Sequence, residues 1–470
     1  MQAIFEKDKD TICALSTPPG RGGIAVIRVS GDKAKTVIQQ LCTTLPESLN
    51  THRVYFTKLH EKQSFINIDE VLVTYFAQGK SYTGEETIEV SCHGSPYISQ
   101  KIVNELIKAG CRHAEKGEFT YRAFLNNKID LVQAESVLNL IESQSSRSTQ
   151  QAFRQLQGEL SKEIDKIEED ILLVGAHLEA HIDFVEQDIE PDQEQALLDK
   201  VTNTSKRVKK LIETYDKGRL LKEGVQVVLL GEPNVGKSSL LNSLLNENKA
   251  IVTDIAGTTR DVVSGSLIIN GVQVKFFDTA GVRVSENMIE KIGIEKTFET
   301  LQNSDIVFVV IDATDPKIPD FNYDLLKNKD VHVVINKCDK LFSPIELENL
   351  KRNIIKNLNF LQNTPKDEDL LGVSAKTELG LEQLLLKIKD FISGDLNDND
   401  VAVVSSRQYE CLMDCDRYLE NSKKLLINNE SPEFTAFEIK NALLAVQKLL
   451  GKEFDDQIMD KVFSEFCLGK

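Results

Sequence analysis

The chain has 470 residues, of which 41% are hydrophobic and 27% are charged, and its formal net charge is −17. This length predicts about three domains, and the composition is typical of a soluble globular protein. The acidic balance argues against a protein that coats nucleic acid through a broadly basic surface, because neutralising phosphates requires lysine and arginine. It leaves room for a local basic patch such as "VTNTSKRVKKL" at 201–211, for which a solvated helix face is favoured.

No stretch approaches the roughly 18 consecutive apolar residues that a membrane span requires, and the first residues show no apolar or arginine-rich leader. The eight cysteines are scattered and form no C-x-x-C pair, so we expect reduced thiols. Together these observations predict a cytoplasmic protein that does not contact a membrane.

Residues 1–125 are predicted to form an α+β domain. Short β-rich runs, among them "GGIAVIRVSG" and "IDEVLVTYFA", alternate with turn residues and with one helical pattern, "SQKIVNELIKAG". This mixture is typical of a compact domain that contains both strands and helices.

Residues 126–223 and 394–470 are predicted to be helical. In the first piece, apolar side chains recur at steps of three and four residues, which predicts a long amphipathic helix with a narrow apolar seam. In the second piece, "SPEF" at 431–434 has the pattern of an N-cap serine followed by a proline at the first helical position. The seam of the long helix consists of Leu160, Ile164, Ile167, Ile171, Val174 and Leu178.

Residues 224–393 separate the two helical pieces and alternate apolar β runs with helical patterns. This alternation predicts an inserted α/β domain with a doubly wound parallel sheet. One part differs, because Asn270–Gly271 stands between two apolar runs and is a strong signal for a β-hairpin. We therefore expect one discontinuous helical domain whose pieces come together around the insert.

The segment "GEPNVGKS", Gly231–Ser238, matches the phosphate-binding pattern G-x-x-x-x-G-K-[ST] between a predicted strand and a predicted helix. Backbone N–H groups of such a loop and the helix dipole receive the β-phosphate, while Lys237 neutralises charge and Ser238 is a ligand for Mg²⁺. We expect Lys237 to act in catalysis as well. The expected GTP-binding residues of this loop are Asn234, Val235, Gly236, Lys237, Ser238 and Ser239.

The segment "NKCD", Asn336–Asp339, follows a predicted strand. Its aspartate would accept hydrogen bonds from N1–H and the exocyclic amine of guanine, which adenine does not offer. "SAK", Ser374–Lys376, supplies a backbone amide for guanine O6. With "DTAG" between the phosphate loop and "NKCD", the order of motifs predicts a Ras-like P-loop G domain. The residues expected to bind GTP are Asn336, Lys337, Asp339, Ser374, Ala375, Lys376, Asp278, Thr279, Ala280 and Gly281.

The segment "VTDIAGTTRD" lies between the phosphate loop and the predicted hairpin, where Thr259 is the expected second ligand of Mg²⁺ and Asp278 acts at one remove from the ion. After "DTAG" the chain has Val282, whose isopropyl group cannot orient water as the glutamine of many GTPases does. Hydrolysis is therefore slow, or another group performs this step. The expected GTP-binding residues of the segment are Thr253, Asp254, Ile255, Ala256, Gly257, Thr258 and Thr259.

Five further stretches, in order, resemble the bacterial TrmE (MnmE) family of tRNA-modification GTPases across essentially the full chain. The resemblance implies an α+β folate-binding N-terminal domain that also forms a homodimer, a discontinuous helical domain and an inserted G domain. The stretches are "TPPGRGGIAVIRVSG" at 17–31, "GEFTYRAFLNNKIDLVQAE" at 117–135, "GTTRD" at 257–261, "EKIGIE" at 290–295 and "FCLGK" at 466–470.

The resemblance also implies that hydrolysis requires K⁺, held between two facing G domains where it supplies the charge of an arginine finger. Glu290 corresponds to the family's general glutamate, which orients water indirectly. From spacing alone, Glu290 could equally be an exposed helix carboxylate. The implied K⁺ ligands are Asn234, Thr253, Ile255 (through its carbonyl) and Thr258.

A site for 5-formyl- or methylene-tetrahydrofolate is implied in the N-terminal region, with contacts from Arg28, Glu89, Lys128 and the terminal Lys470. Arginine and lysine suit the carboxylates and carbonyls of a folate, but the residues by themselves indicate only solvated surface positions. Cys467 is a candidate catalytic residue if the chain terminus reaches another domain's pocket, and packing is the alternative.

By resemblance, the activity is GTP hydrolysis that drives domain motion while an aminomethyl-type group, such as (carboxymethyl)aminomethyl, is installed on C5 of the wobble uridine of tRNA. The implied partner is an MnmG-type flavoprotein that carries FAD, uses NADH and forms a heterotetramer with this chain. A ribosome-assembly GTPase switch is the alternative, and it leaves the folate-like region unused. A nucleotide-gated scaffold with negligible hydrolysis is a second alternative, to which Val282 points.

Two further pairs of side chains have the spacing of metal ligands but lack the rest of a metal-binding pattern. His177 and His181 stand one helical turn apart in "HLEAH", which is not the pattern H-E-x-x-H, so helix packing is favoured. Cys411 and Cys415 share a predicted helix face without a second pair in the sequence, which favours a buried apolar stripe.

Overall fold

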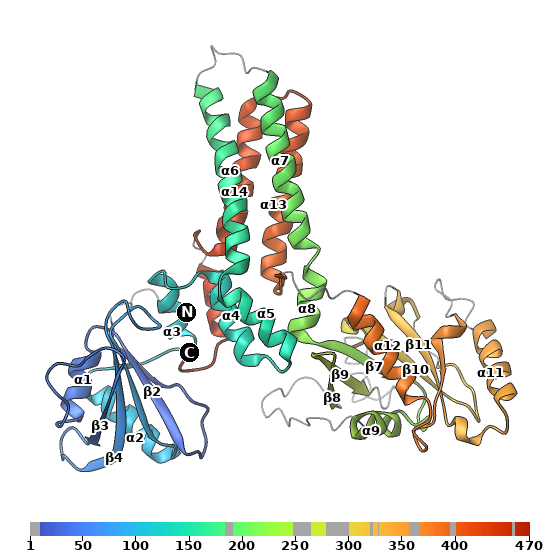
Figure 1. The fold of residues 1–470 in the computed structure, drawn as a ribbon, viewed down its shortest axis with the longest axis horizontal. Coiled ribbons are helices and arrows are strands. Elements are labelled where there is room, and N and C mark those ends of the chain that lie inside the picture. Colours follow the sequence, from blue (N-terminus) through green and yellow to red (C-terminus); the bar gives the residue numbers. More distant parts are fainter. Residues whose placement is uncertain are drawn as a thin grey trace, which may run out of the picture. The chain divides into compact units, whose positions relative to one another are not determined.

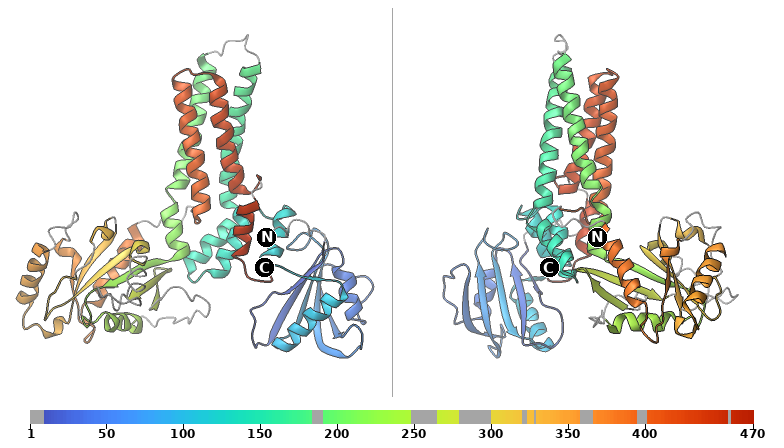
Figure 2. Two further views of the ribbon diagram at one scale, coloured as in Figure 1. Left: turned by 180° about the vertical axis from the view of Figure 1, so that it is seen from behind. Right: turned by 45° about the vertical axis from the view of Figure 1, so that its right-hand side comes forward.

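The computed structural model describes residues 10–183, 191–247, 265–278, 300–319, 323–327, 329–357, 366–394, 401–453 and 456–470 (Figures 1 and 2). The chain divides into two compact units. The first unit contains Met1–Ile141, Phe153–Lys210 and Glu410–Lys470, and the second contains Glu142–Ala152 and Leu211–Tyr409.

A six-stranded sheet begins the first unit, with strand order β3-β4-β5-β2-β1-β6 (Figure 1). Neighbouring strands are antiparallel, except that β1 and β6 are parallel. The strands are β1 (Ile12–Leu15), β2 (Ile24–Ser30), β3 (Arg53–His60), β4 (Asn67–Phe76), β5 (Thr87–His93) and β6 (Arg112–His113).

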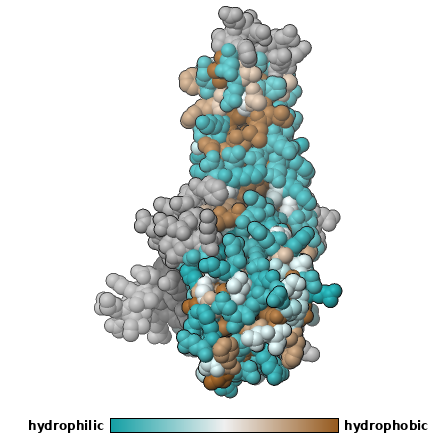
Figure 3. Space-filling view, turned by 90° about the vertical axis from the view of Figure 1, so that its left-hand side faces the viewer, coloured by the Kyte–Doolittle hydropathy of each residue, from teal (hydrophilic) through white to brown (hydrophobic). Residues whose placement is uncertain are grey.

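Helices α1 (Ala34–Leu41) and α2 (Pro96–Ala109) share one apolar core with this sheet. Alternate strand residues such as Ile27 and Val29 meet Ile38 of α1 there, because successive strand side chains point to opposite faces. Large apolar side chains also remain exposed, among them Phe56 of β3 directly opposite Leu72 of β4. Figure 3 shows apolar patches on a largely hydrophilic surface. The α+β prediction is confirmed.

The rest of the first unit is helical, and α6, α7, α13 and α14 run side by side in a bundle (Figures 1 and 2). All six residues of the predicted seam are buried on α6. Helix α14 begins with Ser431 as N-cap and proline in its first turn, as predicted. The helices are α3 (Glu118–Leu125), α4 (Leu131–Glu142), α6 (Glu159–Asp183), α7 (Pro191–Ile212), α13 (Ser406–Ile427), α14 (Pro432–Leu450) and α15 (Asp456–Ser464). Helix α5 (Ser146–Leu156) belongs to the second unit as far as Ala152.

The bundle confirms the discontinuous helical domain, because α6 and α7 precede the inserted sheet in the chain and α13 and α14 follow it. Helices α6 and α14 approach closely at Gly175, where a Cβ would lie 3.6 Å from Cγ2 of Ile439. Lys452, directly after α14, forms ion pairs with Asp165 and Glu168 of α6. Segments far apart in the sequence thus pack as one body.

The second unit contains a sheet with strand order β12-β11-β10-β7-β9-β8, parallel except for β8. Apolar cores lie on both of its faces, so the doubly wound prediction is confirmed. Short 3₁₀ turns occur at Tyr323–Leu326, Cys338–Lys340 and Asp367–Asp369. The other elements are β7 (Val225–Leu230), β8 (Gly265–Ile269), β9 (Val272–Asp278), β10 (Ile306–Asp312), β11 (Asp330–Asn336), β12 (Leu370–Gly372), α8 (Tyr215–Glu223), α9 (Lys237–Glu247), α11 (Pro344–Asn357) and α12 (Leu381–Gly394).

The predicted hairpin is formed by β8 and β9. Asn270 and Gly271 adopt φ values of +49° and +74°, the left-handed pair that a tight two-residue turn requires. The carbonyl of Gly271 accepts a hydrogen bond from the backbone N–H of Arg147, 3.2 Å away, in the first turn of α5. The hairpin therefore satisfies one of the helix's unpaired N–H groups.

Candidate functional sites

The phosphate loop leaves β7 and enters α9, as predicted, at the carboxyl edge of the parallel strands. Asn234 and Gly236 have left-handed backbone, with φ values of +67° and +97°. A Cβ on Gly236 would lie only 2.4 Å from Nδ2 of Asn336, so this position requires glycine both for its conformation and for space.

Lys237 opens α9 and its side chain is almost fully buried, at 6% exposure. Its Nζ donates hydrogen bonds to the carbonyls of Gly231 (2.8 Å) and Glu232 (3.1 Å). Burial lowers the pKa of Lys237, while the nearby carboxylates of Asp278 and Glu232 act in the opposite direction. The ammonium is thus held in the loop by backbone carbonyls, where a phosphate would be a stronger partner.

Ser238 and Asp278 meet at the same edge, because β9 pairs with β7 in parallel and ends beside the phosphate loop. The hydroxyl of Ser238 donates to Oδ2 of Asp278 across 2.7 Å. A hydroxyl and a carboxylate side by side form the hard oxygen donor set that Mg²⁺ prefers. Ser238, a predicted Mg²⁺ ligand, therefore lies directly beside Asp278, which was predicted to act through such a ligand.

The guanine-recognition loop begins at Asn336, at the end of β11. The Asn336 side chain donates from Nδ2 to the carbonyl of Val235 (2.9 Å) and accepts at Oδ1 from the N–H of Ala375 (3.1 Å). One buried amide therefore joins the phosphate loop, "NKCD" and "SAK". The sequence motifs, taken separately, did not predict this connection.

Asp339 and Ser374, both predicted to bind GTP, lie side by side. Ser374 donates from Oγ to Oδ1 of Asp339 across 2.6 Å, and the same oxygen of Ser374 accepts from the N–H of Thr377 at 3.2 Å. The carbonyl of Ala375 accepts from Ser243 of α9. The Asp339 carboxylate is exposed at the loop surface with its orientation fixed by Ser374, as hydrogen bonding to a base edge requires.

Asp312 belongs to this site although the sequence motifs did not identify it. It ends β10 directly beside Asn336, and its Oδ2 lies 2.6 Å from Nζ of Lys337. The same Nζ donates to the carbonyl of Asn234 at 2.8 Å. The signal that could have identified Asp312 is its place at the carboxyl end of a buried strand next to the "NKCD" strand.

Part of the predicted nucleotide site lies outside the described residues. The predicted second Mg²⁺ ligand, three of the four K⁺ ligands and the general glutamate belong to it. Of the K⁺ set, only Asn234 is described. The residues concerned are Thr253, Asp254, Ile255, Ala256, Gly257, Thr258, Thr259, Thr279, Ala280, Gly281, Val282 and Glu290.

In the first unit, Arg28 on β2 and Glu89 on β5 are direct cross-strand partners and form an ion pair of 2.9 Å. The Arg28 guanidinium also lies 5.6 Å from the ring centres of both Tyr82 and Phe119. Tyr82 and Phe119 were not among the folate contacts predicted from the sequence. Lys128 donates from Nζ to the carbonyl of Gly79, on the loop that carries Tyr82.

The chain terminus reaches the N-terminal part of the same unit. Leu468 forms a β-bridge with Lys116, and the N–H of Phe119 donates to the backbone oxygen of Lys470 at 3.2 Å. A Cβ on Gly469 would lie 2.1 Å from the carbonyl of Leu15, so the approach depends on this glycine. Cys467, which directly precedes these contacts in the chain, is exposed. The terminal segment thus lies against Phe119, one of the two rings beside Arg28.

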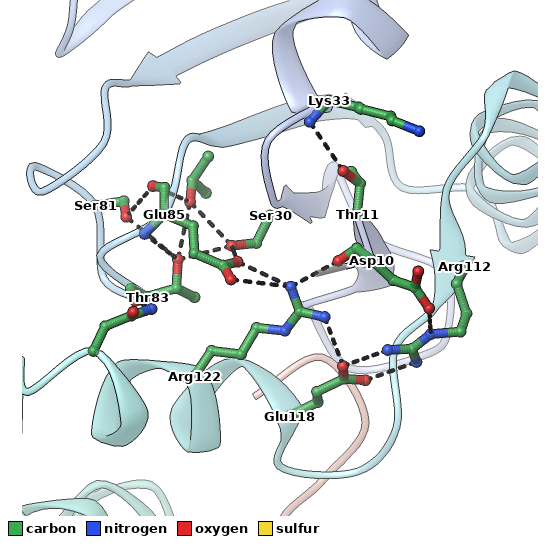
Figure 4. A network of polar contacts seen from close by, with 12 residues as sticks. Asp10, Thr11, Ser30, Lys33, Ser81, Thr83, Glu85, Arg112, Glu118 and Arg122 are labelled. Carbon is green, nitrogen blue, oxygen red and sulfur yellow. Dashed lines mark hydrogen bonds and ion pairs between the residues drawn. The ribbon is translucent and has the colours of Figure 1, made fainter. Parts of the chain in front are cut away.

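A buried ion-pair network lies in the same unit (Figure 4). Arg122, 2% exposed, donates to Glu85 (3.0 and 3.1 Å), to Glu118 (2.9 Å) and to the carbonyl of Asp10 (2.8 Å). Arg112 forms two further bonds to Glu118. Burial raises the pKa of Glu118, but the bonds from Arg112 and neighbouring groups outweigh it and hold this pKa below its ordinary value.

The surroundings of the two lesser metal candidates are described in part. Within the described part of the chain, no group of three or more His, Cys, Asp or Glu side chains could hold a metal ion. Cys415 is buried and Cys411 is partly buried on α13, which agrees with an apolar stripe. The packing interpretation of His177 is wrong, because its side chain is exposed on α6.

No described helix combines the length and the apolar character needed to cross a membrane.

Comparisons with known proteins cover nearly the whole chain. A family profile described as "GTP-binding protein TrmE N-terminus" matches residues 11–128, and one described as "MnmE helical domain" matches residues 131–467. The "tRNA modification GTPase MnmE" of Bdellovibrio bacteriovorus is 44% identical over 99% of this chain and 98% of its own length. That of Christiangramia forsetii is 38% identical over 99% of this chain and 100% of its own length.

Among solved structures, an Aquifex aeolicus Era variant bound to GDP and aluminium fluoride matches 41% of this chain and 66% of its own. The two are 25% identical, with a TM-score of 0.28.

Proposed function

This chain belongs to the MnmE (TrmE) family of tRNA modification GTPases, and we propose that it hydrolyses GTP in a K⁺-dependent manner to drive modification of C5 of the wobble uridine. The observation that carries the proposal is the joining of three nucleotide loops by Asn336, with Ser238 and Asp278 2.7 Å apart beside them. This arrangement supplies contacts for phosphates, for Mg²⁺ and for guanine in one site.

For hydrolysis, we assign charge neutralisation on the phosphates to Lys237, and Mg²⁺ ligation to Ser238 and Thr259. K⁺, when bound, supplies the positive charge that an arginine finger gives in other GTPases. Glu290 orients the attacking water indirectly, since Val282 cannot. The support from the described residues is Asn234, whose left-handed loop position is held through its carbonyl by Lys337. The proposed K⁺ ligands are Asn234, Thr253, Ile255 and Thr258.

For the one-carbon chemistry, we assign a tetrahydrofolate site to Arg28, Glu89, Lys128 and Lys470, with Cys467 as a catalytic thiol. The Arg28 guanidinium lies 5.6 Å from the ring centres of Tyr82 and Phe119, and Lys470 accepts a hydrogen bond from the backbone N–H of Phe119. A ring system and a carboxylate tail suit such surroundings. In this proposal 5-formyl- or methylene-tetrahydrofolate is the ligand, and FAD and NADH belong to an MnmG-type partner.

The proposed assembly is a cytoplasmic homodimer that joins the MnmG-type protein in a heterotetramer and acts on tRNA. The proposed domains are residues 1–125, 126–223, 224–393 and 394–470. Nucleotide-dependent pairing of G domains changes the helical domain, whose two pieces flank the insert in the sequence. The net charge of −17 agrees with a partner that provides much of the surface for tRNA.

The decisive experiment is nucleoside mass spectrometry of tRNA from a strain that lacks this protein. We expect the C5-modified wobble uridine to disappear and to return when the gene is restored. Normal wobble nucleosides together with abnormal ribosomal subunits would overturn the proposal in favour of a ribosome-assembly GTPase.

The K⁺ requirement is tested by measuring GTP turnover in K⁺ and then in Na⁺. We expect fast turnover in K⁺ alone, and loss of most of that turnover in Glu290→Ala with GTP binding retained. Equal, very slow rates in both salts would instead indicate a nucleotide-gated scaffold, and an unchanged rate in Glu290→Ala would remove Glu290 from the mechanism.

A further inference from the structure

The carboxylate of Asp312 has its two oxygens committed to different partners. Oδ1 accepts from the N–H (2.9 Å) and the hydroxyl (2.7 Å) of Thr314, and Oδ2 accepts from Nζ of Lys337 at 2.6 Å. The Asp312 side chain is 13% exposed. Because Thr314 fixes the rotation of the carboxylate, the charge that faces Lys337 has a defined position.

Lys337 in turn connects two strained backbone positions. Its own φ is +64°, and its Nζ donates to the carbonyl of Asn234, whose φ is +67°. A residue other than glycine costs of the order of 1–3 kcal/mol in this conformation and persists only where surrounding contacts determine it. Asn234 lies in the phosphate loop and Lys337 in the guanine-recognition loop, so this one ammonium connects both.

We propose that Asp312 is a positioning residue for guanine-nucleotide binding, which acts through Lys337 to hold the phosphate loop and the guanine-recognition loop in one geometry. The inference deepens the proposed function and rests on its assignment of a guanine nucleotide to this site. Asp312 is not among the residues assigned to contact the nucleotide or its ions. Its effect on nucleotide binding is therefore indirect.

The chemistry explains why an anion is needed at this position. Lysine is a strongly hydrated point charge on a flexible stem, and 27% of the Lys337 side chain is exposed. Without a carboxylate beside it, the ammonium gains more from water than from a single carbonyl, and its contact with Asn234 loosens. A charge-assisted bond of 2.6 Å retains the ammonium over that carbonyl.

The test compares Asp312→Ala and Asp312→Asn with Asp315→Ala in the full-length protein. Asp315 is a matched control, because it lies on the same loop and pairs with Lys317 at 2.8 Å. Unlike those of Asp312 and Lys337, the side chains of Asp315 and Lys317 are both largely exposed. Binding of fluorescent GDP is measured in Na⁺, where no K⁺ contributes. Steady-state GTP hydrolysis is then measured over a range of K⁺ concentrations.

For Asp312→Ala we expect the dissociation constant for GDP to rise roughly tenfold, which corresponds to about 1.4 kcal/mol. We also expect a higher K⁺ concentration at half-maximal activation, because Asn234 is in the proposed K⁺ set. The maximal rate at saturating GTP and K⁺ should stay within about twofold of wild type, since the change affects binding rather than the transition state. Asp312→Asn retains an acceptor and should recover part of the affinity.

The proposal is overturned if Asp312→Ala binds GDP as tightly as Asp315→Ala does. It is equally overturned if Asp312→Asn, which conserves shape, unfolds with Asp312→Ala, since Asp312 would then be structural. Failure of the proposed function has a different signature, because wild-type protein would then lack GDP binding or K⁺ activation before any substitution is made.

Discussion

The nucleotide loops of the second unit and the Arg122 network of the first unit both bury cations, but they give them different partners. Lys237 donates to two backbone carbonyls, those of Gly231 and Glu232. Arg122 instead donates to the carboxylates of Glu85 and Glu118 (Figure 4). A neutral carbonyl is readily exchanged for a phosphate, whereas a buried carboxylate is not. Burial of a cation therefore indicates a ligand site only when its protein partners are replaceable.

The largest effect is expected from Arg122→Met. Removing Arg122 takes away the cation that pairs with Glu85 and one of the two that pair with Glu118. Loss of one partner of a buried ion pair costs about 3–5 kcal/mol of the free energy of unfolding. Chemical denaturation of the full-length protein, followed in parallel by GDP binding, measures both units. We expect the first unit to unfold at lower denaturant while GDP affinity remains unchanged.

Arg53→Met is the control, because Arg53 is exposed on β3, and its substitution should change stability by less than about 0.5 kcal/mol. If Arg122→Met is no more destabilising than this control, the network does not stabilise the unit. If Arg122→Met abolishes GDP binding in folded protein, the Arg122 network is not purely structural, and its proposed contrast with the nucleotide loops is wrong.

Gly236→Ala is expected to have the next largest effect, now on the nucleotide. The new Cβ meets Nδ2 of Asn336 at 2.4 Å in a backbone with φ of +97°. Strain alone of about 1–3 kcal/mol would raise the dissociation constant for GDP by roughly 5- to 150-fold. Asn234→Gly, which relieves the other strained position of the loop, should retain GDP affinity in Na⁺. Equal affinities for wild type and Gly236→Ala would refute this account.

The places of the described phosphate-loop and "NKCD" residues were predictable because each motif is local, and a loop that follows a buried strand lies at a known edge of the sheet. The seam of α6 was predictable for a similar reason, since its period belongs to one helix. Contacts between distant segments were not. Asp312 reaches Lys337 only through the pairing of β10 with β11, and Arg28 reaches Glu89 only through the register of β2 on β5. A single sequence carries no signal for either register.

A smaller, pH-dependent effect is expected for Arg112→Met. In wild type the pKa of Glu118 is held below its ordinary value of about 4.5, against the effect of burial, by Arg112 and neighbouring groups. A carboxyl with a lowered folded-state pKa contributes stability above its ordinary pKa, and this is lost as pH falls through the folded-state pKa. The variant should therefore be less stable by roughly 1–2 kcal/mol at neutral pH.

The difference in unfolding free energy between wild type and Arg112→Met should shrink as denaturation is repeated from neutral pH to values below the ordinary glutamate pKa. Lys58→Met, which removes an exposed partner of Glu70, provides the control with a small difference at all pH values. A difference that grows in acid would have the opposite sign and would exclude Glu118 as the titrating group.

The smallest effect on stability is expected for Cys467→Ser, and this separates a chemical role from a packing role. The thiol is exposed, so its substitution should change the unfolding free energy by less than about 0.5 kcal/mol. Phe466→Ala, at the neighbouring buried position, should cost about 3–5 kcal/mol. If wobble-uridine modification fails in a stable Cys467→Ser variant, the thiol acts chemically. If modification is normal, Cys467 has no chemical role, and the terminal segment contributes only through its backbone contacts.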